Sequence, residues 1–245
     1  MDSSGRSEFE RPRSVAEIIG EALDIYQRYP LLFLVLALVV IAPYELAVLA
    51  ITGQGSLAET GKHAVEQYYL LLLIQTAVVT PLVSALHIHA VARIGEGSEP
   101  RFVQVTLRAL QVLPVVVAAV LVATAGTALG LIALIIPGVL LFLRWSVVAQ
   151  VAALEHEGWI PSLRRSQQLT RGHYWHIIGL LILVGLLGSA INLGAGSIPL
   201  GSTSGVASVA AGIAVHTITA SLSALTLALL YFDLRGRASQ EPTRT

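Results

Sequence analysis

Three ionisable side chains interrupt long apolar runs of this sequence, and they are the residues best placed to do chemistry. Arg144 lies six residues beyond Gly138, which is roughly 9 Å along a helix that rises 1.5 Å per residue. Glu45 lies six residues before Ile51, the end of its own run, and His216 lies near the middle of the last run. A charge at mid-membrane costs on the order of 2.5–3.5 kcal/mol, so such residues find a partner or mark a functional site.

Arg144 allows two interpretations. As a functional residue it binds an anion or a lipid headgroup. As a structural residue it pairs with Glu45 at matching depth, or its long side chain reaches back to the outer headgroups. We favour the structural interpretation, with Glu45 as the partner.

Small and polar side chains share one face of the last apolar run. This face either lines a polar pathway or mediates close helix packing, and packing is the commoner use of such residues. The same holds for the pair Gly126 and Gly130. The residues of the polar face are Gly212, His216, Thr219, Ser223 and Thr226.

Catalytic, metal and cofactor motifs are missing from the sequence. There is no cysteine, which excludes disulfides and thiolate chemistry. His87 and His89 point about 200° apart on a helix, so they suit no shared metal. The cluster of His156, His173 and His176 fits a membrane interface better than a metal site. With no phosphate loop, His-Glu-x-x-His or Gly-x-Ser-x-Gly motif, we predict neither an enzyme nor a cofactor.

The composition is that of a membrane protein. Hydrophobic residues make up 55% of the 245, charged residues 12%, and the mean hydropathy is +0.75, whereas soluble domains carry about 25% charge. The formal net charge is +0, which argues against a nucleic-acid partner. Arginine is strongly preferred over lysine, as GC-rich codons would dictate, and this favours a bacterial source.

The arginines predict the topology. Thirteen of the fourteen lie outside the apolar runs, in alternate connecting segments. The intervening segments contain one basic residue, Lys62. Because cytoplasmic loops collect Lys and Arg, both termini are predicted to be cytoplasmic in a bacterial plasma membrane. The first run lacks the order of a cleaved signal peptide. The six predicted spans are Leu31–Ile51, Tyr68–Val91, Val112–Ile136, Val139–Leu154, Trp175–Leu193 and Val206–Phe232.

Short amphipathic segments precede the first, third and fifth spans. Ser14 and Glu17 have the spacing of a capping box at the start of the first segment. The second segment is residues 100–111. The third carries Arg164, Arg165 and Arg171 as candidate headgroup-binding residues. The predicted fold is therefore all-α: a polytopic bundle of six transmembrane helices in three hairpins, each preceded by a short interfacial helix.

The chain is predicted to hold one membrane domain between two polar tails. The domain covers residues 14–232, and the tails cover residues 1–13 and 233–245. Both tails are polar enough to be disordered. Whether the three hairpins are a true repeat is left open.

A series of short motifs in residues 136–175 resembles a known family. These motifs are Ile136-Pro137-Gly138-Val139, Arg144-Trp145, Glu155, Ser162-Leu163-Arg164-Arg165-Ser166 and Gly172-His173-Tyr174-Trp175. In this order they are similar to bacterial proteins with the membrane domain associated with glycerophosphoryl diester phosphodiesterases. The resemblance implies a multi-helix membrane domain. It implies no hydrolysis, because no stretch of this chain supplies the catalytic barrel, and Ala149-Gln150 stand where family members tend to have proline.

Two hypotheses for function follow. In the first, the protein is a non-catalytic integral membrane protein that organises lipids or partner proteins, including other copies of itself, at the cytoplasmic leaflet. In the second, it is a small permease or lipid translocator with a polar site around Arg144, Glu45 and His216. Transport requires these three groups to line one connected cavity, whereas a structural role pairs Arg144 with Glu45.

The predicted topology is testable by cysteine labelling, because the chain is free of cysteine. Single cysteines at Thr60 and Leu200 should react with a membrane-impermeant reagent added outside cells. Cysteines at Gly5, Gly97 and Gln240 should react only after the membrane is permeabilised. External labelling at Gly97 would contradict the arrangement.

Overall fold

The computed structural model describes residues 9–52, 64–155, 157–196 and 205–240, and these residues form helices without strands. Ten α-helices and one π-helical turn follow one another along the chain. They are α1 (Val15–Arg28), α2 (Pro30–Thr52), α3 (Ala64–Ile74), the π-helical turn (Gln75–Val79), α4 (Thr80–Gly95), α5 (Phe102–Ala133), α6 (Ile135–Arg144), α7 (Val148–Glu155), α8 (Trp159–Thr170), α9 (Tyr174–Gly196) and α10 (Gly205–Gln240).

Within the described residues, six helical segments are long and apolar enough to cross a membrane, and together they confirm the predicted all-α polytopic fold. Each overlaps one of the six predicted spans. The segments are Pro30–Ile51, Glu66–Gly95, Phe102–Ala133, Ile135–Glu155, Tyr174–Gly194 and Ala207–Gln240.

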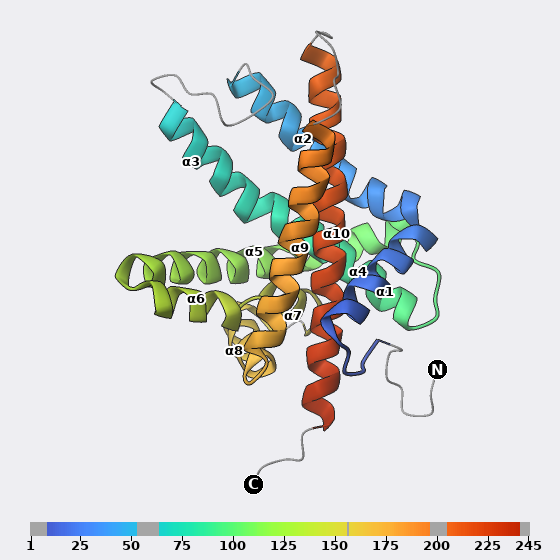
Figure 1. Cartoon of the computed structure of the whole chain (residues 1–245), viewed down its shortest axis with the longest axis vertical. Coiled ribbons are helices and arrows are strands. Elements are labelled where there is room, and N and C mark those ends of the chain that lie inside the picture. The colour runs from blue at the N-terminus through green and yellow to red at the C-terminus, as the bar shows by residue number, and fades with distance from the viewer. Residues whose placement is uncertain (1–8, 53–63, 156, 197–204, 241–245) are drawn as a thin grey trace.

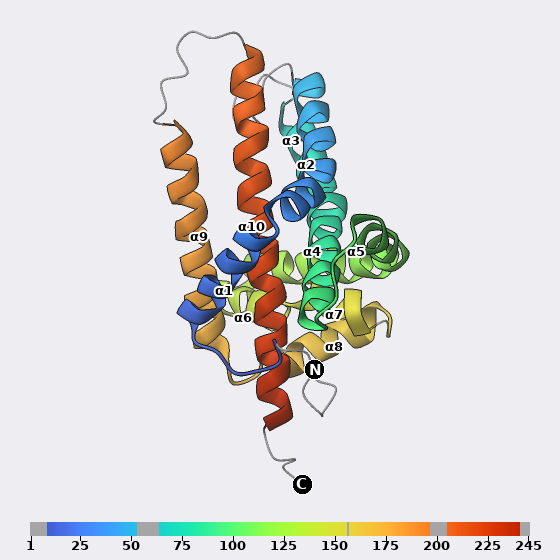
Figure 2. The ribbon, with the colours of Figure 1, turned by 90° about the vertical axis from the view of Figure 1, so that its right-hand side faces the viewer.

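The helix α10 is the central element of the bundle. It lies between α9 on one side and α2 with α4 on the other (Figure 1, Figure 2). Its cytoplasmic half, by the predicted topology, is almost wholly buried, with Leu225, Leu229 and Tyr231 fully covered.

The first amphipathic helix forms as predicted, and a reciprocal cap fixes its start. The backbone N–H of Ser14 donates to the Glu17 carboxylate over 2.6 Å, and the Ser14 hydroxyl accepts from the Glu17 N–H over 3.3 Å. These bonds satisfy helix-start groups that would otherwise lack partners. The buried face of α1, which includes Ile18 and Ile25, packs against α10, α9 and α2.

The hairpin of α5 and α6 differs in direction from the prediction. It extends sideways, so that α5 passes across α10 instead of running beside it (Figure 1). Apolar side chains at its tip are exposed, Ile132 and Ile136 each by 82%. In addition, residues 102–111 belong to one continuous helix with the span, so the second amphipathic segment is no separate helix. Apolar periodicity predicts that a helix forms, and it carries no information about the helix's direction.

Glycines hold α5 and α6 together. A Cβ atom at Gly138 would lie 2.4 Å from the backbone nitrogen of Leu131, and one at Gly130 would lie 2.9 Å from the Gly138 Cα. At Gly126 it would lie 2.7 Å from the Trp145 ring. The predicted packing role of Gly126 and Gly130 is therefore confirmed, since only glycine allows this approach.

The fourth apolar run is broken into α6 and α7 at residues 145–147. The Ser166 and Thr170 hydroxyls of α8 donate to the Arg144 carbonyl oxygen, over 2.9 and 3.2 Å. They satisfy a carbonyl that the helix end leaves without its intrahelical partner. The third predicted amphipathic helix, found as α8, is thus a packed element, with Ser162, Ser166 and Leu169 buried.

The described residues of the two predicted tails, 9–13 and 233–240, contact each other. Asp233 accepts a 2.6 Å hydrogen bond from the Arg13 N–H and lies 2.8 Å from the Arg237 guanidinium. The Phe9 ring packs on Phe232, with centroids 6.2 Å apart. Residues 1–8 and 241–245 lie outside the described residues.

The glycine contacts of the hairpin give a stability prediction. Gly138→Ala should lower the melting temperature in detergent, because its methyl group meets backbone and overpacking of this kind costs about 1–3 kcal/mol. Gly185→Ala in α9 is the matched control, since nothing lies within 4 Å of a Cβ there. Equal melting temperatures for the two variants would contradict the close packing.

Candidate functional site

The structure pairs Glu45 with His216, and not with Arg144. The Glu45 carboxylate on α2 lies 2.5 Å from the His216 Nδ1 on α10. The Arg144 Nε instead lies 3.4 Å from the Tyr174 hydroxyl at the start of α9. The predicted pair of Arg144 and Glu45 was wrong because it assumed that α6 and α2 run side by side, whereas α6 belongs to the transverse hairpin (Figure 1).

Polar groups near the Glu45 pair are satisfied locally. The Tyr44 hydroxyl donates to the Leu71 carbonyl over 3.3 Å and lies 3.4 Å from the Gln75 side-chain oxygen. Gln75 opens the π-helical turn, and turns of this kind often accompany a locally altered helix face. The bonds tie α2 to the α3–α4 span, so they explain helix packing without requiring a ligand.

The hydroxyl groups on the polar face of α10 are satisfied within their own helix. The Thr219, Ser223 and Thr226 hydroxyls donate to backbone carbonyls three or four residues earlier. Such back-bonding is the usual way that a helix hides hydroxyls in an apolar environment. The arrangement agrees with the packing interpretation of this face.

Sequence reasoning missed the buried network around His87. His87 is fully buried, with Nδ1 2.8 Å from the Val83 carbonyl and Nε2 2.8 Å from the Ser221 hydroxyl. Because a carbonyl only accepts, Nδ1 donates to Val83, and the single Ser221 proton serves either Nε2 or the Phe33 carbonyl. The Phe33 carbonyl lies 3.3 Å from the same hydroxyl. The network links α2, α4 and α10.

The three basic residues assigned to the third amphipathic helix have different surroundings. Arg165 lies 3.3 Å from the Glu155 carboxylate, which also accepts a 3.0 Å bond from the Tyr231 hydroxyl. Arg164 and Arg171 are exposed. Of the three, Arg164 and Arg171 form no salt bridge with a carboxylate among the described residues.

The joined chain ends hold a second charged cluster. Arg13 is buried, and its Nε lies 2.9 Å from the Glu21 carboxylate. Burial lowers the pKa of Arg13, while Glu21 opposes this shift by favouring the charged form. His176 lies 3.2 Å from Asp233 in the same cluster. No group of three or more potential ligand residues for a metal occurs in the described part of the chain.

A cavity of about 390 Å³ lies where the transverse hairpin meets α4, α7 and α10. This volume falls within the range of about 300–1,000 Å³ typical of small-molecule sites. Most of its wall is apolar, and the polar members are neutral hydroxyls and one amide. These polar residues are Thr80, Ser84, Thr124, Thr127, Ser146 and Gln150.

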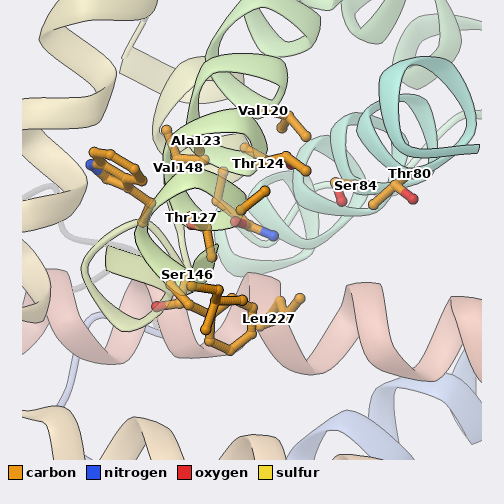
Figure 3. A pocket seen from close by; sticks show the side chains of 15 residues that line it. Thr80, Ser84, Val120, Ala123, Thr124, Thr127, Ser146, Val148 and Leu227 are labelled. Carbon is orange, nitrogen blue, oxygen red and sulfur yellow. The ribbon is translucent and has the colours of Figure 1, made fainter. Parts of the chain in front are cut away.

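The polar residues are spread along the cavity. In the view of Figure 3, Ser146 and Thr127 lie at one end, Thr80 and Ser84 lie at the other, and Thr124 lies between them. The break between α6 and α7 exposes this wall, because it turns the chain at Ser146 and lets α7 pack beside α4.

Two polar atoms of this wall are buried without a hydrogen-bond partner among the described residues. They are the Ser146 hydroxyl and the Gln150 side-chain oxygen. Gln150 is only 1% exposed. Since nearly all buried polar groups are satisfied in proteins, such atoms beside a cavity indicate a missing partner. The sequence signal was weak, because Gln150 is a single amide within an apolar run and belongs to no binding motif.

Most of the chain matches a known family model. The family model described as Domain of unknown function (DUF7847) matches residues 29–234. The chain belongs to this family. No curated protein and no solved structure matches. The matched region contains all the cavity residues. The description of the family does not mention glycerophosphoryl diester phosphodiesterases.

A double-mutant cycle tests the observed pairing. Glu45→Gln and His216→Ala should each lower stability in detergent, and their effects should couple by about 0.5–3 kcal/mol because the two side chains are in contact. Glu45→Gln and Arg144→Leu should be additive. Coupling of Glu45 to Arg144 instead of His216 would show that the helices are arranged otherwise.

Proposed function

We propose that this protein is a non-catalytic integral membrane protein that accommodates a lipid in the cavity between the transverse hairpin, α4, α7 and α10. The observation that carries the proposal is the unpaired Gln150 amide oxygen beside a largely apolar cavity. In a bilayer, lipid is the molecule present at high concentration with both an apolar tail and polar groups. The cavity is open at the protein surface, so a lipid can enter without a large rearrangement.

The bacterial plasma membrane with both termini cytoplasmic remains the proposed setting. Two observations support it. The arginines alternate between connecting segments, and the described chain ends meet through Asp233 and Arg13. An even number of crossings brings the two ends to the same side. Arg164 and Arg171 would then face the cytoplasmic headgroups from the exposed side of α8.

The permease hypothesis has less support. It needs Arg144, Glu45 and His216 around one polar space, but none of the three lines the cavity. Arg144 lies against Tyr174, and the hydroxyls beside His216 bond within their own helix. The Glu45–His216 pair is explained by packing of α2 against α10.

Filling the cavity tests lipid binding. Ala128→Phe places a ring in the cavity wall, and it should at least halve the lipid retained by the purified protein in native mass spectrometry. Ala125→Phe is the matched control, because Ala125 lies on the same helix, is exposed and does not line the cavity. Equal loss or equal retention in both variants would contradict the cavity as the binding site.

A further inference from the structure

The cavity wall also indicates which lipid class it suits. This inference rests on the proposed function and goes beyond it by assigning the polar headgroup. We infer that the cavity binds an uncharged lipid whose polar group is a free hydroxyl, such as a diacylglycerol or a long-chain alcohol.

Charge is the first argument. Among the described residues, no Arg, Lys, His, Asp or Glu lines the cavity. A phosphate placed there would have no cation to compensate the loss of its hydration, and burial of an unpaired charge is strongly unfavourable. The closest arginine in sequence, Arg144, directs its Nε to Tyr174. A phospholipid headgroup therefore fits the cavity poorly.

Hydrogen-bond matching is the second argument. The Gln150 oxygen needs a donor, and the Ser146 hydroxyl can either donate or accept. A ligand hydroxyl can donate to this oxygen. An ester or ether oxygen only accepts, so it cannot satisfy the amide oxygen.

Cavity size and wall chemistry are the third argument. Ordered water can satisfy isolated buried groups, but it needs two to four polar partners for each molecule. A volume of about 390 Å³ bounded mostly by Val120, Ala123, Leu131, Phe142 and Leu227 gives most of its space to apolar contact. An acyl chain fills that space, while the hydroxyl reaches Gln150.

The test compares three photoactivatable lipids with identical acyl chains in phosphatidylcholine nanodiscs that contain the full chain. They are a diacylglycerol, its acetate ester and a phosphatidylglycerol. Cross-links are mapped to residues 120–131 and 145–150. The diacylglycerol should label these segments about three- to tenfold more than the acetate, which is the range expected for one hydrogen bond. It should also label them more than the phosphatidylglycerol.

Protein variants supply the complementary arm. Gln150→Leu should lower diacylglycerol labelling about three- to tenfold and leave labelling by the acetate unchanged. Gln168→Leu, on the exposed side of α8, should change neither. Ser146→Ala is a second variant, for use where Gln150→Leu does not fold. It should weaken labelling by the diacylglycerol and leave labelling by the acetate unchanged.

The outcomes separate the two proposals. Equal labelling by the diacylglycerol and its acetate, or by the phosphatidylglycerol, would overturn the hydroxyl assignment while a lipid cavity remains. Absence of labelling by all three lipids in residues 120–131 and 145–150 would overturn the proposed function as well.

Discussion

A helix inside an apolar environment can end only where its last carbonyl groups find donors, and much of this structure depends on one such end. The helix α6 stops at Arg144, and the hydroxyls of Ser166 and Thr170 reach its carbonyl oxygen from α8. Because the Arg144 carbonyl has these hydrogen bonds, the helix can end there, and after the turn α7 packs beside α4 and α5. An uninterrupted helix through residues 135–155 would leave no turn at Ser146 and no cavity of this shape.

The cavity lies beside the closely packed glycines of α5 and α6, and part of its wall is polar. Gly126, Gly130 and Gly138 draw α5 and α6 together and seat the Trp145 ring against the hairpin. Beside that contact lies the cavity, whose wall includes hydroxyls from α4, α5 and Ser146. Some buried polar groups are satisfied, as Thr219 and His87 show. Ser146 and Gln150 share with Tyr26, Thr106 and Thr217 a buried polar atom that has no hydrogen-bond partner among the described residues, and they differ from those three in lining this cavity.

The chain ends secure the frame around this site. Asp233 gathers the Arg13 N–H, Arg237 and His176, and Gly236 leaves room for the backbone of Glu10, which a Cβ would approach within 2.7 Å. These contacts join the first described residues to the end of α10, the helix that also forms part of the cavity wall through Leu227. A buried charge cluster of this kind fixes an arrangement more than it adds stability, because desolvation offsets most of the attraction.

Local physical chemistry determined the elements, and contacts between distant residues determined the site. The length and apolarity of each run predicted the six long helices, and Ser14 with Glu17 predicted the start of α1, since both depend on neighbours within one turn. The partner of Glu45 depended on which helix lies beside α2, and depth along a helix does not contain that information. Likewise, Gln150 became a candidate ligand-binding residue only when the transverse hairpin placed a cavity beside it. Helix direction and shared walls arise from packing among segments far apart in the chain, so only the tertiary structure decided them.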